Sequence, residues 1–148
     1  MTRENDVDLS EGDGGNSKVQ DLKRRCEMVR KIQPDCVLSI HQNSYPEEAI
    51  HGAQVFYYED SSEGKKLAEI LQKHLVEVLD KENHRQAKGN RTYYMLKKTE
   101  ATLVIVECGF LSNNQEALLL TDEKYQNKVA KAICSGTLEY LSSLAEKK

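Results

Sequence analysis

The feature of this sequence that most constrains its fold is the apolar run "TLVIVEC" at residues 102–108. Its residues are mostly branched and apolar, with almost no alternation of polar positions, which is typical of a strand covered on both faces. Such a strand lies in the middle of a sheet, and both faces of that sheet must pack against other elements. The run therefore predicts a sheet with helices on both sides.

Helical and strand-like patterns alternate along the rest of the chain. Helices are predicted over residues 17–33, 60–79, 113–120 and 122–144. The first three begin with capping-box pairs, which are Ser17 with Gln20, Asp60 with Glu63 and Asn113 with Glu116. Strands are predicted over residues 36–40, 53–58 and 92–96, in addition to the central run. This alternation predicts an α/β fold in which helices cover both faces of a largely parallel or mixed sheet.

Length and composition restrict the class of protein. The 148 residues predict one domain, with residues 1–16, which carry five acids, forming a loop. No apolar stretch approaches the roughly 20 residues that span a bilayer, and the acidic start lacks the pattern of a signal peptide. A net charge of -3, with both signs mixed along the chain, argues against nucleic acid as the main partner.

Most cysteine and histidine side chains are expected to be structural or solvated. The four cysteines lie far apart without a CxxC pair and are interpreted as thiols in the core, namely Cys26, Cys36, Cys108 and Cys134. His74 lies on the apolar face of its predicted helix and is expected at the edge of the core. His51 and His84 lie in polar segments and are expected to be solvated.

Two ionisable residues stand where predicted strands end. His41 follows "CVLSI", and Glu107 lies near the end of the central run. Ligands of open α/β sheets bind beyond the carboxyl ends of the strands. An ionised carboxylate is costly to bury, so Glu107 is either a general base with a raised pKa or one partner of a buried ion pair. His41 is either a metal ligand or a hydrogen-bonded structural residue.

Several segments, taken in order, resemble zinc-dependent N-acetylmuramoyl-L-alanine amidases, especially the type that acts on the spore cortex. The segments are "SIHQNS", "GAQVFYY", "VECGFLSNNQEALLL" and "YQNKVAKAICSGTLEYL". "SIHQN" alone is a weak motif, whereas "VECGFLSN" further along in the same order is specific. The resemblance extends from "TREND" at the start of the chain to the last predicted helix.

The resemblance implies a bacterial hydrolase that cleaves the amide between the lactyl group of muramic acid and L-alanine in peptidoglycan. It implies one zinc ion held by His, Glu and His, of which His41 matches the last ligand, and a catalytic glutamate that Glu107 matches. The implied location is the cell wall or the spore cortex, outside the cell. Substrate-binding residues are not identified: Arg85, Lys88 and Asn113 lie in segments that could approach the substrate or remain solvated loop residues.

The sequence departs from the family at its start. Members begin with a strand that runs into a "DPGHGG"-like loop bearing the first histidine, followed by a helix with the ligand glutamate. Neither has a counterpart here, and "TREND" resembles the end of the family's second strand. We therefore expect the first strand, the first helix and two zinc ligands to be missing, zinc to bind weakly at most, and an exposed sheet edge to allow self-association.

Three interpretations follow from this departure. In the first, the chain is an amidase for which Met1 is an internal methionine. In the second, it is a truncated, non-catalytic remnant that binds peptidoglycan. In the third, it is a scaffold that completes its metal site with ligands from another chain.

Overall fold

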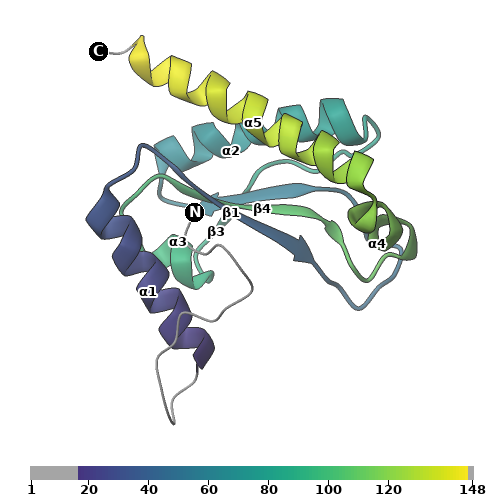
Figure 1. Ribbon diagram of the computed structural model, residues 1–148, viewed down its shortest axis with the longest axis horizontal. Helices are drawn as coiled ribbons and strands as arrows, with labels where there is room; N and C mark the ends of the chain where they lie inside the picture. Colours follow the sequence, from purple (N-terminus) through teal and green to yellow (C-terminus); the bar gives the residue numbers. More distant parts are fainter. Residues whose placement is uncertain (1–16, 147–148) are drawn as a thin grey trace.

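The structure is a computed structural model that describes residues 17–146, in which helices pack on both faces of one four-stranded sheet (Figure 1). The elements in chain order are α1 (Ser17–Ile32), β1 (Val37–Asn43), β2 (Gln54–Tyr58), α2 (Ser62–Leu79), β3 (Lys88–Asn90), α3 (Tyr94–Lys98), β4 (Leu103–Phe110), α4 (Asn114–Thr121) and α5 (Glu123–Ala145). The predicted α/β class with helices on both faces is confirmed. The expected loop over residues 1–16 lies outside the described residues, and the division into one domain stays a prediction.

The sheet has the strand order β1-β4-β2-β3 and is mixed. β1 runs parallel to β4, β2 runs antiparallel to β4, and β3 runs parallel to β2. Every residue of β4 is buried, as the apolar run predicts. β4 is thus the interior strand to which β1 and β2 are both hydrogen-bonded.

Alternate residues of β4 point to opposite faces of the sheet and enter two separate cores. Val104, Val106 and Cys108 pack with residues of α2 and α5 in the larger core. Leu103 and Ile105 pack with Cys26 of α1 and with Met95 and Leu96 of α3 in the smaller one. In Figure 1, α2 and α5 lie above the sheet, and α1 and α3 lie below it.

The helix pair α2 and α5 packs closely around one glycine. A Cβ atom at Gly136 of α5 would lie 2.9 Å from Cδ2 of Leu71 on α2 and 3.3 Å from the Leu71 Cα. Polar contacts flank this point: His74 Nε2 lies 2.7 Å from Glu139 Oε2, and the Tyr140 hydroxyl donates to Glu63 Oε2 over 3.1 Å. Gly136 therefore allows the close approach of the two helices. His74 is half-buried, as predicted.

Side-chain caps define where the later helices begin. Asn113 Oδ1 accepts the amide N–H groups of Gln115 and Glu116, and Asp122 Oδ1 accepts that of Tyr125. The cap at Asn113 follows the sequence prediction, whereas the cap at Asp122 was not predicted. The cap of α2 is Ser61, whose hydroxyl accepts the N–H of Gly64, rather than Asp60 one residue earlier.

Three local predictions were wrong. Residues 92–96 do not form a strand, because α3 occupies Tyr94–Lys98, and β3 forms where no strand was predicted. Cys134 is exposed on α5 and Cys36 is only half-buried, so only Cys26 and Cys108 are core thiols.

Among residues 17–146, no helix is both long enough and apolar enough to cross a membrane.

Candidate active site

A row of three polar side chains crosses the sheet on the face that α1 and α3 cover. His41 of β1 is the register partner of Glu107 of β4, and Gln54 of β2 is the partner of the same glutamate on its other side. Directly opposed residues on neighbouring strands point to the same face of the sheet. The structure therefore places the two predicted site residues beside each other, with Gln54 as a third member.

Glu107 is a carboxylate in an apolar setting. The residue is only 8% exposed to solvent, and the Oε2 atom of its side chain has no hydrogen-bond partner among the described residues. Burial raises its pKa above the ordinary value of 4.5. Burial also raises the pKa of Tyr93, and the charge of Glu107 adds to that rise. No salt bridge to Glu107 occurs among the described residues, which favours the general-base interpretation over a buried ion pair.

His41 is more exposed than Glu107 and lies inside a strand. β1 continues through Gln42 to Asn43, so the expected change to a loop at His41 was wrong. The Nε2 atom of His41 lies 2.8 Å from the Ser39 hydroxyl oxygen, two residues earlier on the same face. A cavity of about 340 Å³ opens on this part of β1 and reaches Arg25 of α1 and Met95 of α3. The imidazole thus borders an open space on one side, and the buried carboxylate of Glu107 stands beside it on the neighbouring strand.

Gln54 is held by the segment that follows α2. Its amide nitrogen donates to Gln86 O over 2.9 Å, and Arg85 Nη1 donates to its Oε1 over 3.2 Å. The Arg85 Nε also donates to His51 O over 2.7 Å, and its guanidinium lies 4.9 Å from the centre of the Phe110 ring. Arg85 therefore adds a fixed positive charge near the end of β4.

Sequence reasoning did not identify Gln54, although a signal was present. A polar residue inside the predicted strand "AQVFYY" is the same kind of misfit that drew attention to Glu107. Of the other candidates, Lys88 is exposed on β3, and Asn113 caps α4 and donates to Glu48 O. His51 and His84 are exposed, as predicted.

Glu116 fixes the loop between β1 and β2 to the end of β4. Its Oε1 accepts the amide N–H of Gly52 over 3.0 Å, and its Oε2 accepts that of Phe110 over 2.8 Å. Ser112 adds a contact by accepting the N–H of Tyr45. The segment "FLSNNQE" thus organises the loop that leads away from His41. An ordered loop at the end of the strands is what a substrate-binding site requires.

The described residues do not fit a zinc site by themselves. A catalytic zinc ion takes three protein ligands and one water. Among residues 17–146, no group of three His, Cys, Asp or Glu side chains is arranged to hold a metal ion. The expected ligand His41 lies opposite Glu107, which the resemblance assigns to catalysis, and its Nε2 atom contacts Ser39.

Comparison with known proteins adds an independent observation. The model of the N-acetylmuramoyl-L-alanine amidase family matches residues 1–139. The germination-specific N-acetylmuramoyl-L-alanine amidase of Bacillus subtilis is 39% identical over 145 residues, which cover 96% of this chain and 61% of that protein. N-acetylmuramoyl-L-alanine amidase LytC of the same organism is 30% identical over 84% of this chain and 25% of its own length. The chain therefore spans less than two thirds of these relatives.

Solved structures share the fold. The CwlD amidase of Clostridioides difficile, determined in complex with the GerS lipoprotein, matches with a TM-score of 0.92 and 38% identity, over 96% of this chain and 74% of that one. The catalytic domain of CwlV, an N-acetylmuramoyl-L-alanine amidase from Bacillus (Paenibacillus) polymyxa, matches with a TM-score of 0.80 and 28% identity, over 95% and 70%. The arrangement of β1, β4 and the helices around them is thus that of these proteins.

Proposed function

The chain belongs to the N-acetylmuramoyl-L-alanine amidase family, and we propose that the Glu107 site hydrolyses the amide between the lactyl group of muramic acid and L-alanine in peptidoglycan. One observation carries the proposal: a buried carboxylate with an unpartnered oxygen stands between His41 and Gln54 in the sheet, and His41 lines an open cavity. Such a carboxylate has little structural value and is suited to proton transfer.

Glu107 acts in this proposal as general base and then as general acid. It accepts a proton from the water whose oxygen bonds to the amide carbon. It then gives that proton to the nitrogen as the carbon–nitrogen bond breaks. The products are a glycan with a free lactyl carboxylate and a stem peptide whose alanine amine is free. Burial raises the Glu107 pKa and so makes the carboxylate a better base near neutral pH.

His41 remains our candidate metal ligand. It supplies one imidazole, and residues 17–146 do not supply the further ligands that a three-ligand zinc site needs. The five carboxylates of residues 1–16 lie outside the described part of the chain. The steps given for Glu107 therefore involve only the substrate, water and this side chain.

Zinc is expected to bind weakly at most. A titration of the 148-residue chain with zinc, followed by competition with a chromophoric chelator, should show no saturation at one equivalent, because residues 17–146 arrange no group of three ligands around a metal ion. His41→Ala should remove the weak binding, and His84→Ala, at an exposed histidine elsewhere, should leave it unchanged. Tight binding of one equivalent that survives His41→Ala would refute the assignment of His41.

Incubation of the chain with purified peptidoglycan and zinc is expected to release stem peptides with a free N-terminal L-alanine. We expect this release to be slow, because the described residues offer a metal only one imidazole. Mass spectrometry after labelling of new amino groups measures it. A chain that sediments with peptidoglycan but releases no peptide would support the alternative, a non-catalytic binding remnant. A chain that does neither contradicts both.

The relatives suggest where the protein acts and with what. One is named as germination-specific and others as cell wall amidases, and we propose the spore cortex or the cell wall as the place of action, with peptidoglycan as substrate. CwlD of Clostridioides difficile was determined with a lipoprotein bound, so a protein partner is a second proposal for this chain.

A further inference from the structure

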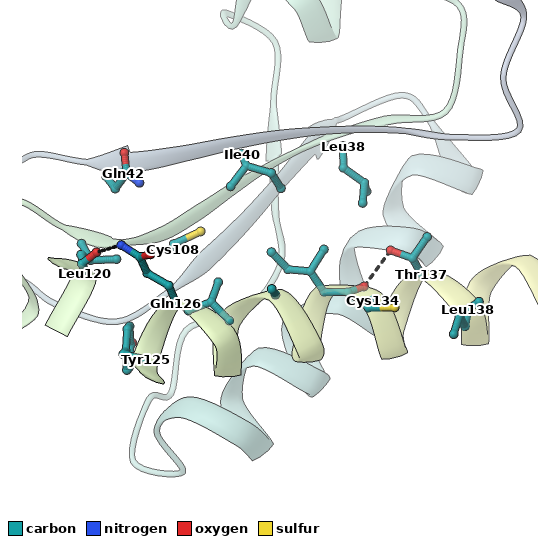
Figure 2. Close-up of a pocket in the computed structure, with 13 residues that line it drawn as sticks. Leu38, Ile40, Gln42, Cys108, Leu120, Tyr125, Gln126, Cys134, Thr137 and Leu138 are labelled. Atoms are coloured by element: carbon teal, nitrogen blue, oxygen red, sulfur yellow. Dashed lines mark hydrogen bonds between the residues drawn. The ribbon is translucent and has the colours of Figure 1, made fainter. Parts of the chain in front are cut away.

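The two faces of the sheet carry different side chains. Leu38 and Ile40 of β1 line a pocket between the sheet and α5 and point toward that helix, as Figure 2 shows. Successive residues of a strand point to opposite faces, so His41 points away from α5, and Glu107 opposite it points the same way. A side chain that contacts a substrate at Glu107 therefore lies on this second face, the site face.

Arg85 reaches the site face from the segment that follows α2. Asn43 lies two residues after His41 on β1 and so points to the same face, and Asn43 is the register partner of Phe110. The Phe110 ring therefore lies on the site face as well. The guanidinium of Arg85 lies 4.9 Å from the centre of that ring, and its Nη1 donates to Gln54 Oε1. A positive charge thus stands on the same face as the proposed base.

Contacts on several sides hold this guanidinium in place. Its Nε donates to His51 O over 2.7 Å, its Nη1 donates to Gln54 Oε1 over 3.2 Å, and the buried Phe110 ring lies against it. The backbone of Arg85 is fixed too, because its N–H donates to Oδ1 of Asn83, a residue that is only 6% exposed. An arginine held in this way has already lost much of its rotamer freedom before a ligand binds.

Most of the hydrogen-bonding capacity of this guanidinium is unused. Arginine has five side-chain N–H donors. In the part of the chain that the structure describes, Nε and Nη1 are the only side-chain atoms of Arg85 that donate, and the salt bridges there involve other cations. Glu116, which contacts the neighbouring residues Gly52 and Phe110, gives both of its oxygens to backbone amides. The remaining donors of Arg85 form a planar fork, which fits the two oxygens of a carboxylate.

The separation of Arg85 from Glu107 matches two residues of an extended peptide. Gln54 lies one strand away from Glu107, and Arg85 lies one hydrogen bond beyond Gln54. With strands about 4.8 Å apart, the guanidinium is roughly 8 Å from the base. An extended peptide advances about 3.5 Å per residue, so its second residue is about 7 Å from the bond that precedes the first. A peptide cleaved at Glu107 therefore brings its second residue to Arg85.

We propose that Arg85 binds the free carboxylate of the second residue of the stem peptide and so selects acidic over amidated stem peptides. This assignment rests on the substrate proposed for the Glu107 site. The second residue of the stem peptide is D-glutamate joined through its side chain, which leaves its α-carboxylate free. The contact aligns the peptide across Gln54 and places the scissile amide at the base. Arg85 also balances the charge that a second carboxylate brings near Glu107.

Two soluble compounds test this preference. N-acetylmuramoyl-L-alanyl-D-glutamate carries the free α-carboxylate, and N-acetylmuramoyl-L-alanyl-D-isoglutamine carries an amide in its place. NMR titration of the 148-residue chain with Glu107→Gln measures their binding, so neither compound is consumed and the result does not depend on hydrolysis. We expect the free acid to bind about tenfold more tightly, because a charged, bidentate contact replaces a neutral one.

Variants on the same background assign the preference to one side chain. Arg85→Gln should reduce it to less than about twofold, and Arg85→Lys, which keeps the charge but loses the fork, should lower it by about threefold. Lys81→Gln removes the same charge from an exposed side chain of the same segment and should leave the preference unchanged. An arginine that only held Gln54 and the loop in place would, when replaced, weaken the binding of both compounds equally.

The ratio of the two affinities decides the outcome. Equal affinities for the two compounds before any change at Arg85, or binding of neither, overturn the proposal. A preference that survives Arg85→Gln overturns it as well. Thermal unfolding shows whether Arg85→Gln is folded, and if it is not, an undiminished preference in Arg85→Lys has the same meaning. The role of Glu107 is judged separately, by the release of peptides from peptidoglycan.

Discussion

Glu107→Gln is expected to abolish hydrolysis and, at neutral pH, to stabilise the fold. The amide cannot accept the proton of water, so the rate should fall by about 100-fold to 10,000-fold. The variant also removes a buried carboxylate whose Oε2 has no partner, and its free energy of unfolding should rise by about 1 kcal/mol. Peptide release and thermal unfolding measure the two effects on the same samples.

The pH dependence of unfolding separates this effect from a general change in stability. The native Glu107 pKa lies above 4.5, so the folded state retains a proton that the unfolded state has lost. Between pH 4.5 and the higher pKa of Glu107 in the folded chain, the free energy of unfolding of the parent chain falls as pH rises, because the folded state binds more protons than the unfolded state. Glu107→Gln should lack this contribution. Glu77→Gln, at an exposed position of α2, should keep both the parent pH profile and the parent rate. A less stable Glu107→Gln chain, or one that still hydrolyses, contradicts the proposed role.

Gly136→Val is expected to lower the free energy of unfolding by about 3 kcal/mol. The branched side chain would meet Leu71 and His74 at the crossing of α2 and α5, where a Cβ alone already lies within 3.3 Å of the Leu71 backbone. The helices would have to separate, which opens the larger core. Urea denaturation measures the loss.

Ser135→Val is the matched control for this prediction, since the same substitution one residue earlier points to solvent. Its effect should stay within about 0.5 kcal/mol. Gly136→Ala should change stability less than Gly136→Val, because the higher helix propensity of alanine offsets part of the crowding. Equal losses at positions 135 and 136 would show that the crossing tolerates a larger side chain.

The sequence predicted the features that depend on local patterns. The burial of β4 followed from its unbroken apolar run, and the cap at Asn113 followed from its spacing to Glu116. Glu107 was identified because an acid is out of place in such a strand. Its position opposite His41 depends on strand register, which the sequence does not state.

The features that the sequence did not reveal depend on tertiary contacts. "TYYML" has the composition of a strand, yet Asn90 Oδ1 accepts the N–H groups of Thr92 and Tyr93 and turns the chain before α3. β3 has little strand propensity of its own and forms along the side of β2 away from β4. Arg85 reaches Gln54 and Phe110 from a segment that reads only as polar loop.

The carboxylate of Glu116 has a consequence for motion near the site. Because its two oxygens hold the amides of Gly52 and Phe110, neither the loop nor the end of β4 can open without loosening the same side chain. The two amides should therefore exchange their hydrogens with solvent in one concerted opening event rather than independently. The segment after His41 and the segment after Glu107 then form one cooperative unit, so the surroundings of the base and of the imidazole become ordered or disordered together.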